Sequence, residues 1–369
     1  MKKLGFGFMR LPLTNEDDPS SIDMQKSKQM VDYFMNKGFT YFDTAYPYHG
    51  GKSEEALREL LVKRYPRESF ILANKLPSFL LKSAEDCQRI FDEQLVKCGV
   101  DYFDYYLVHD LGASSYKQCE KFGGFDLVNK KKAEGKIKHL GFSFHDTADV
   151  LEKILDEHPE TEFVQLQLNY VDWDSDTVQA KRCYELARSR GKEVIVMEPV
   201  KGGMLANLPK EAEPLLKDYH PEMSVSSWAV RFAASHEGVI MVLSGMSNME
   251  QLMDNISYMD DFKPLNQEEL KLLSKVEDII KSQKTIACTA CKYCIDGCPK
   301  NIAIPKFFML YNGIKIYGNL SHQRHYYANF IEDHAKASDC IECRKCEKVC
   351  PQHLNITKYL KQVAEKFEV

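Results

Sequence analysis

The sequence predicts an α/β fold: a (β/α)8 barrel, the TIM-barrel architecture, followed by a small, mainly helical domain. The chain has 369 residues, more than one hydrophobic core usually supports, so two domains are expected. Short apolar runs rich in β-branched and aromatic residues alternate with amphipathic helical segments up to about residue 260. Eight of the 12 cysteines lie beyond that point, which sets the second domain apart.

Eight short runs have the composition of strands, and helical patterns separate them. They are Gly5–Met9, Thr40–Ala45, Phe70–Leu76, Phe103–His109, Ile137–Ser143, Phe163–Asn169, Val194–Pro199 and Val239–Ser244. Regular strand–helix alternation implies parallel strands joined by right-handed crossovers, and eight units over roughly 250 residues favour a closed barrel. A doubly wound open sheet is the alternative, but no G-x-G-x-x-G sequence opens a helix after the first strand.

Local signals indicate where helices end and where the domains divide. Ser83 is a suitable N-cap with an acidic residue three positions later, and Gly99 stands where a helix C-terminus often has glycine. A helical segment from residue 267 to about 283 leads into the cysteine-rich region. We therefore expect the barrel at residues 1–283 and the second domain at residues 284–369.

The bulk composition narrows the classes of function. The formal net charge of −5 gives no support for binding to nucleic acid or to a membrane surface. No run approaches the roughly 18 apolar residues that span a bilayer, and the first apolar run is too short for a signal peptide. Clustered cysteines in a large chain without a signal indicate metal ligands rather than disulfides, so a reducing, cytoplasmic location is expected.

Two cysteine motifs in the second domain duplicate each other. Each reads C-x2-C-x2-C-x3-C-P, the spacing of bacterial two-cluster ferredoxins, in which the fourth cysteine of each run binds the other cluster. The motifs therefore predict two [4Fe–4S] clusters. One cluster would be held by Cys288, Cys291, Cys294 and Cys350, and the other by Cys340, Cys343, Cys346 and Cys298.

A pair of structural zinc sites is the alternative, because zinc also binds four thiolates. Zinc ribbons usually pair two C-x2-C units across a long gap, whereas here three cysteines stand in tandem with a fourth before proline. The gap between the motifs contains helix-like segments around Phe307–Tyr311 and Tyr326–Ile331. The domain therefore resembles the helical two-cluster ferredoxins more than the small β-rich kind.

Four polar residues, Asp43, Tyr48, Lys75 and His109, stand at or just beyond the ends of three consecutive predicted strands. Catalytic groups of (β/α)8 barrels lie at the C-terminal strand ends. A free phenol has a pKa near 10, too high for easy proton donation at neutral pH, and an adjacent ammonium would lower it. A carboxylate can keep that ammonium charged, while an imidazole can hold a carbonyl oxygen in place.

The same residues carry a resemblance to the aldo-keto reductases over roughly residues 1–260. The stretch from Gly38 to Tyr48 looks like the family signature, and the segments ending at Lys75 and His109 match its lysine and histidine segments. The resemblance implies that Tyr48 is the proton donor, with Lys75 and Asp43 as its tuning pair and His109 as the substrate-orienting group. Tyr46 is the runner-up for the donor, and we interpret it as a residue of the pocket wall.

The resemblance also implies a nicotinamide dinucleotide, NADP or NAD, bound in extended form. The matching positions are Ser143, Gln165, Ser244, Gly245, Ser247, Gln251, Asp254 and Asn255, of which the first two would contact the carboxamide and the rest the phosphate and adenine end. Departures from the family pattern are Phe144, Met197, Met246 and Gln251. The missing arginine near position 251 weakens the case for NADP over NAD, although some members use a serine, here Ser247, and a glutamine instead.

The predicted function is that of an NAD(P)H-dependent oxidoreductase that interconverts a small-molecule carbonyl (aldehyde, ketone or sugar) and an alcohol. Structural, sensing and electron-transfer roles, the last with a redox partner protein, stay open for the clusters. We rank the first two slightly higher, because a hydride carries two electrons and each cluster normally passes one. The alternative is a redox-responsive cofactor-binding or electron-transfer protein with little carbonyl turnover. The barrel loops carry no transferable code for the substrate.

Overall fold

The computed structural model describes residues 2–175, 178–283, 285–288, 293–318, 320–350 and 352–368. The chain forms two compact units, Met1–Pro199 with Ser227–Gln267 and Val200–Ser226 with Glu268–Val369. The barrel strands all belong to the first unit and all eight motif cysteines to the second. The two compact units need not coincide with the two domains. The domain boundary expected after residue 283 therefore stays a prediction.

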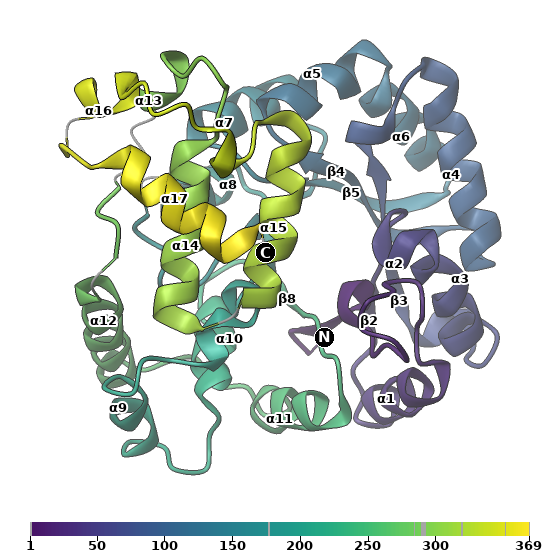
Figure 1. The fold of residues 1–369 in the computed structure, drawn as a ribbon. Helices are drawn as coiled ribbons and strands as arrows, with labels where there is room; N and C mark the ends of the chain where they lie inside the picture. The colour runs from purple at the N-terminus through teal and green to yellow at the C-terminus, as the bar shows by residue number, and fades with distance from the viewer. Residues whose placement is uncertain are drawn as a thin grey trace. The chain divides into compact units, whose positions relative to one another are not determined.

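The first unit contains a closed barrel of eight parallel strands in chain order, as predicted (Figure 1). The strands are β1 (Leu4–Gly7), β2 (Tyr41–Asp43), β3 (Ile71–Pro77), β4 (Phe103–Leu111), β5 (Ile137–Phe144), β6 (Phe163–Gln167), β7 (Glu193–Met197) and β8 (Val239–Ser244). Each predicted strand is confirmed, with ends that differ by at most a few residues. β1 ends two residues early, where the chain turns into a 3-10 segment, Phe8–Arg10, and Phe8 packs edge-on against Phe6 and Phe42.

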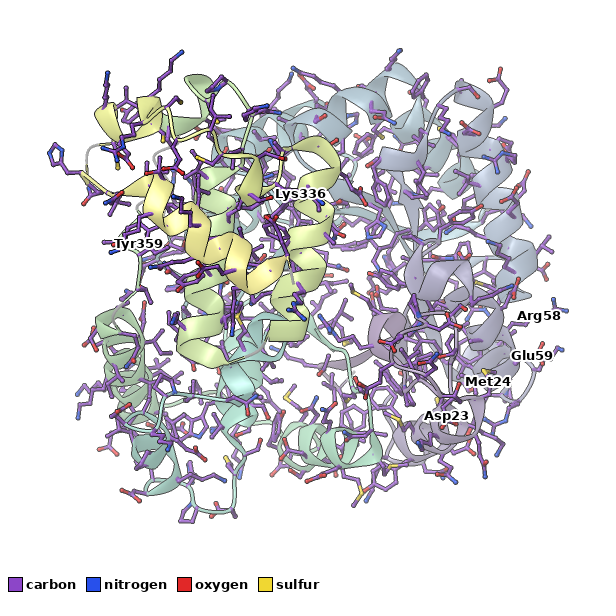
Figure 2. The ribbon with its side chains drawn as sticks, viewed as in Figure 1. Asp23, Met24, Arg58, Glu59, Lys336 and Tyr359 are labelled. Atoms are coloured by element: carbon purple, nitrogen blue, oxygen red, sulfur yellow. The ribbon has the colours of Figure 1, made fainter. Side chains whose placement is uncertain are left out.

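Helices separate the strands along the chain. They are α1 (Met24–Asn36), α2 (Tyr48–Gly51), α3 (Ser53–Leu57), α4 (Ala84–Cys98), α5 (Ala113–Lys121), α6 (Gly124–Ala133), α7 (Ala148–Glu157), α8 (Ala180–Ser189), α10 (Val225–Ala234) and α11 (Met249–Met259). Side-chain caps begin some of them, including α1, α4 and α11. Asp23 caps α1 by accepting a hydrogen bond from the backbone of Lys26 (Figure 2), and Ser83 and Gly99 bound α4 as predicted. Gly99 adopts φ 70°, a conformation that favours glycine.

An apolar plug fills the barrel interior one layer below the strand ends. It consists of Tyr41, Ala73, Leu107, Phe163, Ile195, Met241 and Leu243, all buried. Successive side chains of a strand point to opposite faces, so the residue two positions further along each strand also faces inward. That residue is Asp43 on β2, Lys75 on β3, His109 on β4 and Gln165 on β6. The strand period thus places these polar groups in one layer at the mouth of the barrel.

The second unit is mainly helical, as predicted. Its helices are α9 (Glu213–Lys217), α12 (Gln267–Ser282), α13 (Tyr293–Asp296), α14 (Ile304–Tyr317), α15 (Leu320–Asp333), α16 (Lys345–Lys348) and α17 (Ile356–Phe367). The core around Phe307, Phe308, Tyr327, Leu360 and Val363 joins α14, α15 and α17. In the part of the chain that the structure describes, no helix is long and apolar enough to cross a membrane.

Candidate active site and candidate metal centre

Lys75 is the centre of the polar group at the barrel mouth. Its Nζ donates hydrogen bonds to Oδ1 of Asp43 at 2.6 Å and to the carbonyl oxygen of Thr44 at 2.8 Å, and it lies 3.4 Å from Oη of Tyr48. Lys75 is fully buried and Asp43 is only 3% exposed. A buried ammonium this close to a carboxylate and a phenol couples the protonation of all three groups.

Tyr48 reaches this site from a tight turn rather than from a strand. It follows Pro47 and opens α2, in which His49 and Gly50 both have positive φ values, 53° and 60°. The His49 ring holds the turn, because Nε2 accepts a hydrogen bond from the backbone of Leu11 at 3.2 Å and Nδ1 contacts the carbonyl oxygen of Pro19 at 2.8 Å. The turn thereby directs the Tyr48 phenol back toward Lys75.

His109 completes the group from the neighbouring strand β4. Its ring lies edge-on to the Tyr48 ring, with centroids 6.0 Å apart, and also contacts Phe79. The buried Nδ1 of His109 has no hydrogen-bond partner among the described residues. A buried imidazole nitrogen without a partner costs free energy, so it is a candidate to bind a substrate oxygen.

Burial sets the direction of the pKa of each group. Burial raises the pKa of the Tyr48 phenol above its ordinary value, although the Lys75 ammonium opposes that rise. Burial alone would lower the pKa of Lys75, but the Asp43 carboxylate and the phenol raise it above its ordinary value. Burial, with Lys75 and His145 nearby, holds the pKa of His109 far below its usual range. At neutral pH, the site therefore combines a charged lysine, a protonated phenol and a neutral histidine.

The expected carboxamide end of the cofactor site lies on β5 and β6. Ser143 is buried, and its Oγ accepts a hydrogen bond from the backbone of Asp110 at 2.8 Å. The Gln165 amide nitrogen lies 3.4 Å from the Met197 sulfur, and its buried Oε1 has no partner among the described residues. Ser143 thus supports the strand end, while Gln165 keeps an acceptor available for a ligand.

The segment between β8 and α11 is the expected site for the phosphate and adenine end of the cofactor. Several of its side chains form hydrogen bonds within the segment. Ser244 Oγ accepts a hydrogen bond from Asn255 at 2.7 Å. Gln251 folds back so that its Oε1 accepts a hydrogen bond from the backbone of Ser247 at 2.8 Å. Asp254 is partly buried on α11 one residue before Asn255. These side chains therefore fix the conformation of the loop. The groups that could bind a phosphate here are mainly backbone amides.

Arg10 is a residue of this end that the sequence analysis did not assign to the site. A Cβ atom added to Gly245 would lie 3.1 Å from Cδ of Arg10, so the glycine leaves room for the arginine side chain. Strand pairing brings these segments together, because Phe6 on β1 pairs with Ser244 on β8. In the sequence, Arg10 is only an arginine just beyond a predicted strand. Its proximity to residue 245 becomes visible once the pairing of β1 with β8 is known.

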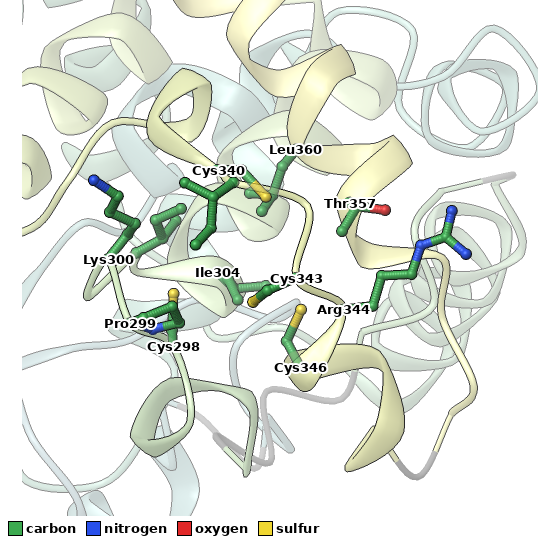
Figure 3. Close-up of a pocket in the computed structure, with 12 residues that line it drawn as sticks. Cys298, Pro299, Lys300, Ile304, Cys340, Cys343, Arg344, Cys346, Thr357 and Leu360 are labelled. Carbon is green, nitrogen blue, oxygen red and sulfur yellow. The ribbon is translucent and has the colours of Figure 1, made fainter.

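Four motif cysteines of the second unit line one cavity. They are Cys298, Cys340, Cys343 and Cys346, and their sulfur atoms gather around a common space in Figure 3. Ile302, Ile304 and Leu360 form apolar walls of this cavity. The predicted pairing of Cys298 with the second motif thus has a spatial counterpart. Within the described residues, no three His, Cys, Asp or Glu side chains are arranged to hold a single metal ion.

From the third cysteine onward, the described parts of the two motifs have the same helices at an offset of 52 residues. The third cysteine of each motif, Cys294 or Cys346, lies on a four-residue helix, α13 or α16. The fourth, Cys298 or Cys350, is followed by the start of a long helix, α14 or α17, at Ile304 or Ile356. Cys288 packs against the same core as these residues, whereas Cys291 lies outside the described residues.

Comparison with known proteins decides the family. The profile of the Aldo/keto reductase family matches residues 3–278, three quarters of the chain. The chain belongs to the aldo/keto reductase family. The profile of a 4Fe-4S dicluster domain matches residues 287–356. Both matches confirm the predicted combination of a reductase barrel with a C-terminal ferredoxin-type domain.

Three proteins illustrate the similarity. L-galactose dehydrogenase of Arabidopsis thaliana is 26% identical over 267 residues, 68% of this chain and 82% of that protein. An aldo-keto reductase from Klebsiella pneumoniae, solved in complex with NADPH, shares the fold with a TM-score of 0.60 and 18% identity over 74% of this chain and 90% of the other. One protein of the ion-translocating oxidoreductase complex of Buchnera aphidicola is 38% identical over 81 residues, 22% of this chain and 14% of that protein.

The residues of this aldo/keto reductase suit a nicotinamide and iron–sulfur clusters. At the barrel mouth, the unpartnered acceptor of Gln165 matches the donor NH2 group of a carboxamide. In the second unit, four thiols around an apolar-walled cavity are the donor set of a [4Fe–4S] cluster. The thiols of Cys298, Cys340, Cys343, Cys346 and Cys350 are free, as cluster binding requires.

A buried network that sequence reasoning missed holds the backbone of Lys75. Pairing of β2 with β3 ends at Asp43 and Ala73, so β2 does not pair with Lys75. Gln94 on α4 donates a hydrogen bond to the carbonyl oxygen of Lys75 at 2.9 Å. Gln94 also donates to the fully buried Glu54 at 2.9 Å. The sequence shows two adjacent glutamates, at positions 54 and 55, but not which one is buried. That depends on how helix α3 packs, so the network could not be predicted from the sequence.

Cysteine variants should separate the two clusters. We expect Cys298→Ser and Cys343→Ser to change the same cluster, because both thiols line one cavity, whereas Cys288→Ser should change the other. Electron paramagnetic resonance of the anaerobically reduced protein and its iron content measure this. Cys183→Ser, which removes a buried thiol of the barrel unit, is the control and should alter neither. A Cys298→Ser spectrum that matches Cys288→Ser would contradict the pairing.

Proposed function

We propose that this protein is an NAD(P)H-dependent oxidoreductase that interconverts a carbonyl and an alcohol, with Asp43, Tyr48, Lys75 and His109 as its catalytic residues. The observation that supports it most is the placement of the buried Lys75 ammonium, 2.6 Å from Asp43 and 3.4 Å from the Tyr48 phenol. Membership of the family agrees with this reaction type.

Each residue has one task in the proposed reduction. Tyr48 holds the proton that passes to the carbonyl oxygen, and the adjacent Lys75 ammonium stabilises the phenolate left behind. Asp43 keeps Lys75 charged and oriented. The neutral His109 donates a hydrogen bond that orients the carbonyl. Bound NADPH or NADH supplies the hydride. In the direction of alcohol oxidation, the phenolate of Tyr48 takes the proton back.

For the cofactor, we propose that Gln165 accepts a hydrogen bond from the carboxamide and that Ser143 supports the same end. The segment Ser244–Asn255 then lies at the phosphate and adenine end, where the backbone amide of Gly245 and the cation of Arg10 suit a diphosphate. The NADPH complex of the Klebsiella relative supports NADP as the first cofactor to test. NAD stays open because Gln251 replaces the usual arginine.

The substrate class that we propose to test first is a sugar or sugar-like aldehyde, because one relative is named L-galactose dehydrogenase. The second domain is proposed to hold two [4Fe–4S] clusters, with Cys291 completing the first. Free thiols and such clusters suit a reducing compartment, so we propose the cytoplasm.

The test is turnover by the anaerobically prepared protein with NADPH or NADH and a panel of aldehydes, ketones and sugars. We expect kcat/KM for reduction to stay level from about pH 6 to about pH 9, because His109 is neutral and Tyr48 protonated over that range. It should fall at higher pH, as the phenol loses its proton. Nucleotide binding without turnover on any carbonyl would contradict the proposal and favour a binding or electron-transfer protein.

A further inference from the structure

One side of the second cysteine motif is open to solvent. Among its ligand residues, Cys343 is exposed, whereas Cys346 is only 7% exposed. The neighbouring apolar side chains do not pack inward, since Ile341 is 58% exposed and Val349 is 48% exposed. Large apolar side chains exposed beside a cofactor edge are typical of a surface that another protein covers.

Basic side chains surround these apolar residues. Arg344, whose side chain is 69% exposed, lines the cysteine cavity beside Ile341, and its guanidinium points away from the four sulfur atoms in Figure 3. Lys345 and Lys348 are exposed and stand three residues apart on α16, so they share one side of it. We call Ile341, Cys343, Arg344, Lys345, Lys348 and Val349 the cluster face.

The acidic residues of the motif are already engaged. Glu342 forms an ion pair with Lys361 at 2.7 Å. Glu347 turns inward, with its side chain 19% exposed, and its Oε1 accepts hydrogen bonds from the backbone and hydroxyl of Thr357. Its Oε2 lies 3.9 Å from Nε of Arg344, so it partly offsets that cation and leaves Lys345 and Lys348 as the main charges of the face. The outward charge of the cluster face is therefore positive, although the chain as a whole carries −5.

Cluster binding alone does not require this charge. The first motif binds through the same cysteine spacing, yet 52 residues before Lys345 and Lys348 it has Tyr293 and Asp296. Lys345 and Lys348 thus belong to one of the two motifs, whereas Arg344 has a basic counterpart in the first motif, Lys292. A positive rim around exposed apolar side chains complements a negatively charged protein and speeds its encounter.

We propose that the cluster face docks an acidic one-electron carrier protein of the ferredoxin or flavodoxin type. This inference rests on the proposed cluster that Cys298, Cys340, Cys343 and Cys346 would hold. A cluster held there would exchange one electron with the carrier in each encounter: the donor would be oxidised and the acceptor reduced by one electron, with no bond formed and no proton moved. Because this motif is exposed, we favour electron transfer over a purely structural role for its cluster.

The experiment mixes oxidised anaerobic holoprotein with a purified acidic [2Fe–2S] ferredoxin that has first been reduced with dithionite and freed of excess reductant. Nucleotide and carbonyl are left out, and cluster absorbance is followed by stopped flow. We expect the second-order rate constant of electron exchange to fall at least about tenfold between low and high salt. The variant Arg344→Glu/Lys345→Glu/Lys348→Glu should lose a similar factor at low salt, with unchanged iron content. The carbodiimide EDC, which joins lysines to carboxylates, should cross-link the ferredoxin at Lys345 or Lys348.

The matched control is Lys130→Glu/Lys271→Glu/Lys275→Glu, which reverses three exposed lysines that are not part of the cluster face and should behave as wild type. A rate constant that is insensitive to salt and to the cluster-face variant would overturn the proposal, as would cross-links that map elsewhere. The assay contains no carbonyl, so its result does not depend on the proposed reductase activity. The two proposals can therefore fail independently.

Discussion

Replacing Tyr48 by phenylalanine should lower kcat for carbonyl reduction by about 10²- to 10⁴-fold, the usual contribution of a positioned general acid. The variant removes the hydroxyl that lies 3.4 Å from Lys75 and leaves the ring in place. Because the proposed cofactor contacts come from other residues, the dissociation constant for NADPH should change little. Steady-state kinetics and quenching of NADPH fluorescence measure the two effects.

Tyr46→Phe is the matched control for this variant. The Tyr46 hydroxyl donates a hydrogen bond to Glu93 on α4 at 2.8 Å, and Lys97 lies over its ring, so this phenol is engaged with residues other than Lys75. Its removal should leave turnover within a few-fold of wild type. If Tyr46→Phe lost activity and Tyr48→Phe kept it, the donor would be the tyrosine that the sequence analysis ranked second.

Replacing Lys75 by methionine should abolish measurable reduction and also destabilise the barrel by about 3–5 kcal/mol. The loss of activity follows because no ammonium would remain to stabilise the Tyr48 phenolate. The loss of stability follows because Asp43, 3% exposed, would keep a buried carboxylate without its partner. Tryptophan fluorescence during urea denaturation measures the second effect in the barrel, since Trp173 and Trp228 both belong to the first unit.

The double variant Asp43→Asn/Lys75→Met distinguishes the two effects of Lys75. It removes both buried charges, so we expect it to regain most of the lost stability while its activity stays absent. A Lys75→Met variant as stable as wild type would mean that the ion pair does not form. A double variant that regains turnover would mean that Lys75 plays no part in proton transfer.

The barrel and its polar layer could be predicted because both follow from short-range periodicity. Strand composition located all eight strands, and alternation along each strand places Asp43, Lys75 and His109 two residues beyond an apolar plug residue. Tyr48 was also a candidate from its place just beyond a strand, but its choice over Tyr46 as donor needed the family resemblance. Its position depends on a turn with two positive φ values that composition does not reveal. The roles of these four residues stay predictions until variants are measured.

Features that depend on long-range packing were not predictable. Glu54 and Gln94 meet behind Lys75 only because α3 and α4 pack on the same strand. The sequence analysis also expected Lys75 to bring the Tyr48 pKa below its ordinary value. The burial of the phenol outweighs that effect, so the pKa lies above the ordinary value. Residue spacing predicted that Lys75 is a neighbour of the Tyr48 phenol, but it could not predict how deeply the phenol is buried.

The proposed role of Tyr48 as the acid beside a reduced nicotinamide has a direct isotopic test. Wild-type protein, supplied with NADPH deuterated at C4 and with a carbonyl that it accepts, should form an alcohol with one deuterium on the former carbonyl carbon. Mass spectrometry should find the same product from Tyr46→Phe, and in the same reaction time at least about 100-fold less of it from Tyr48→Phe. Equal amounts of labelled alcohol from wild type and Tyr48→Phe would contradict the account.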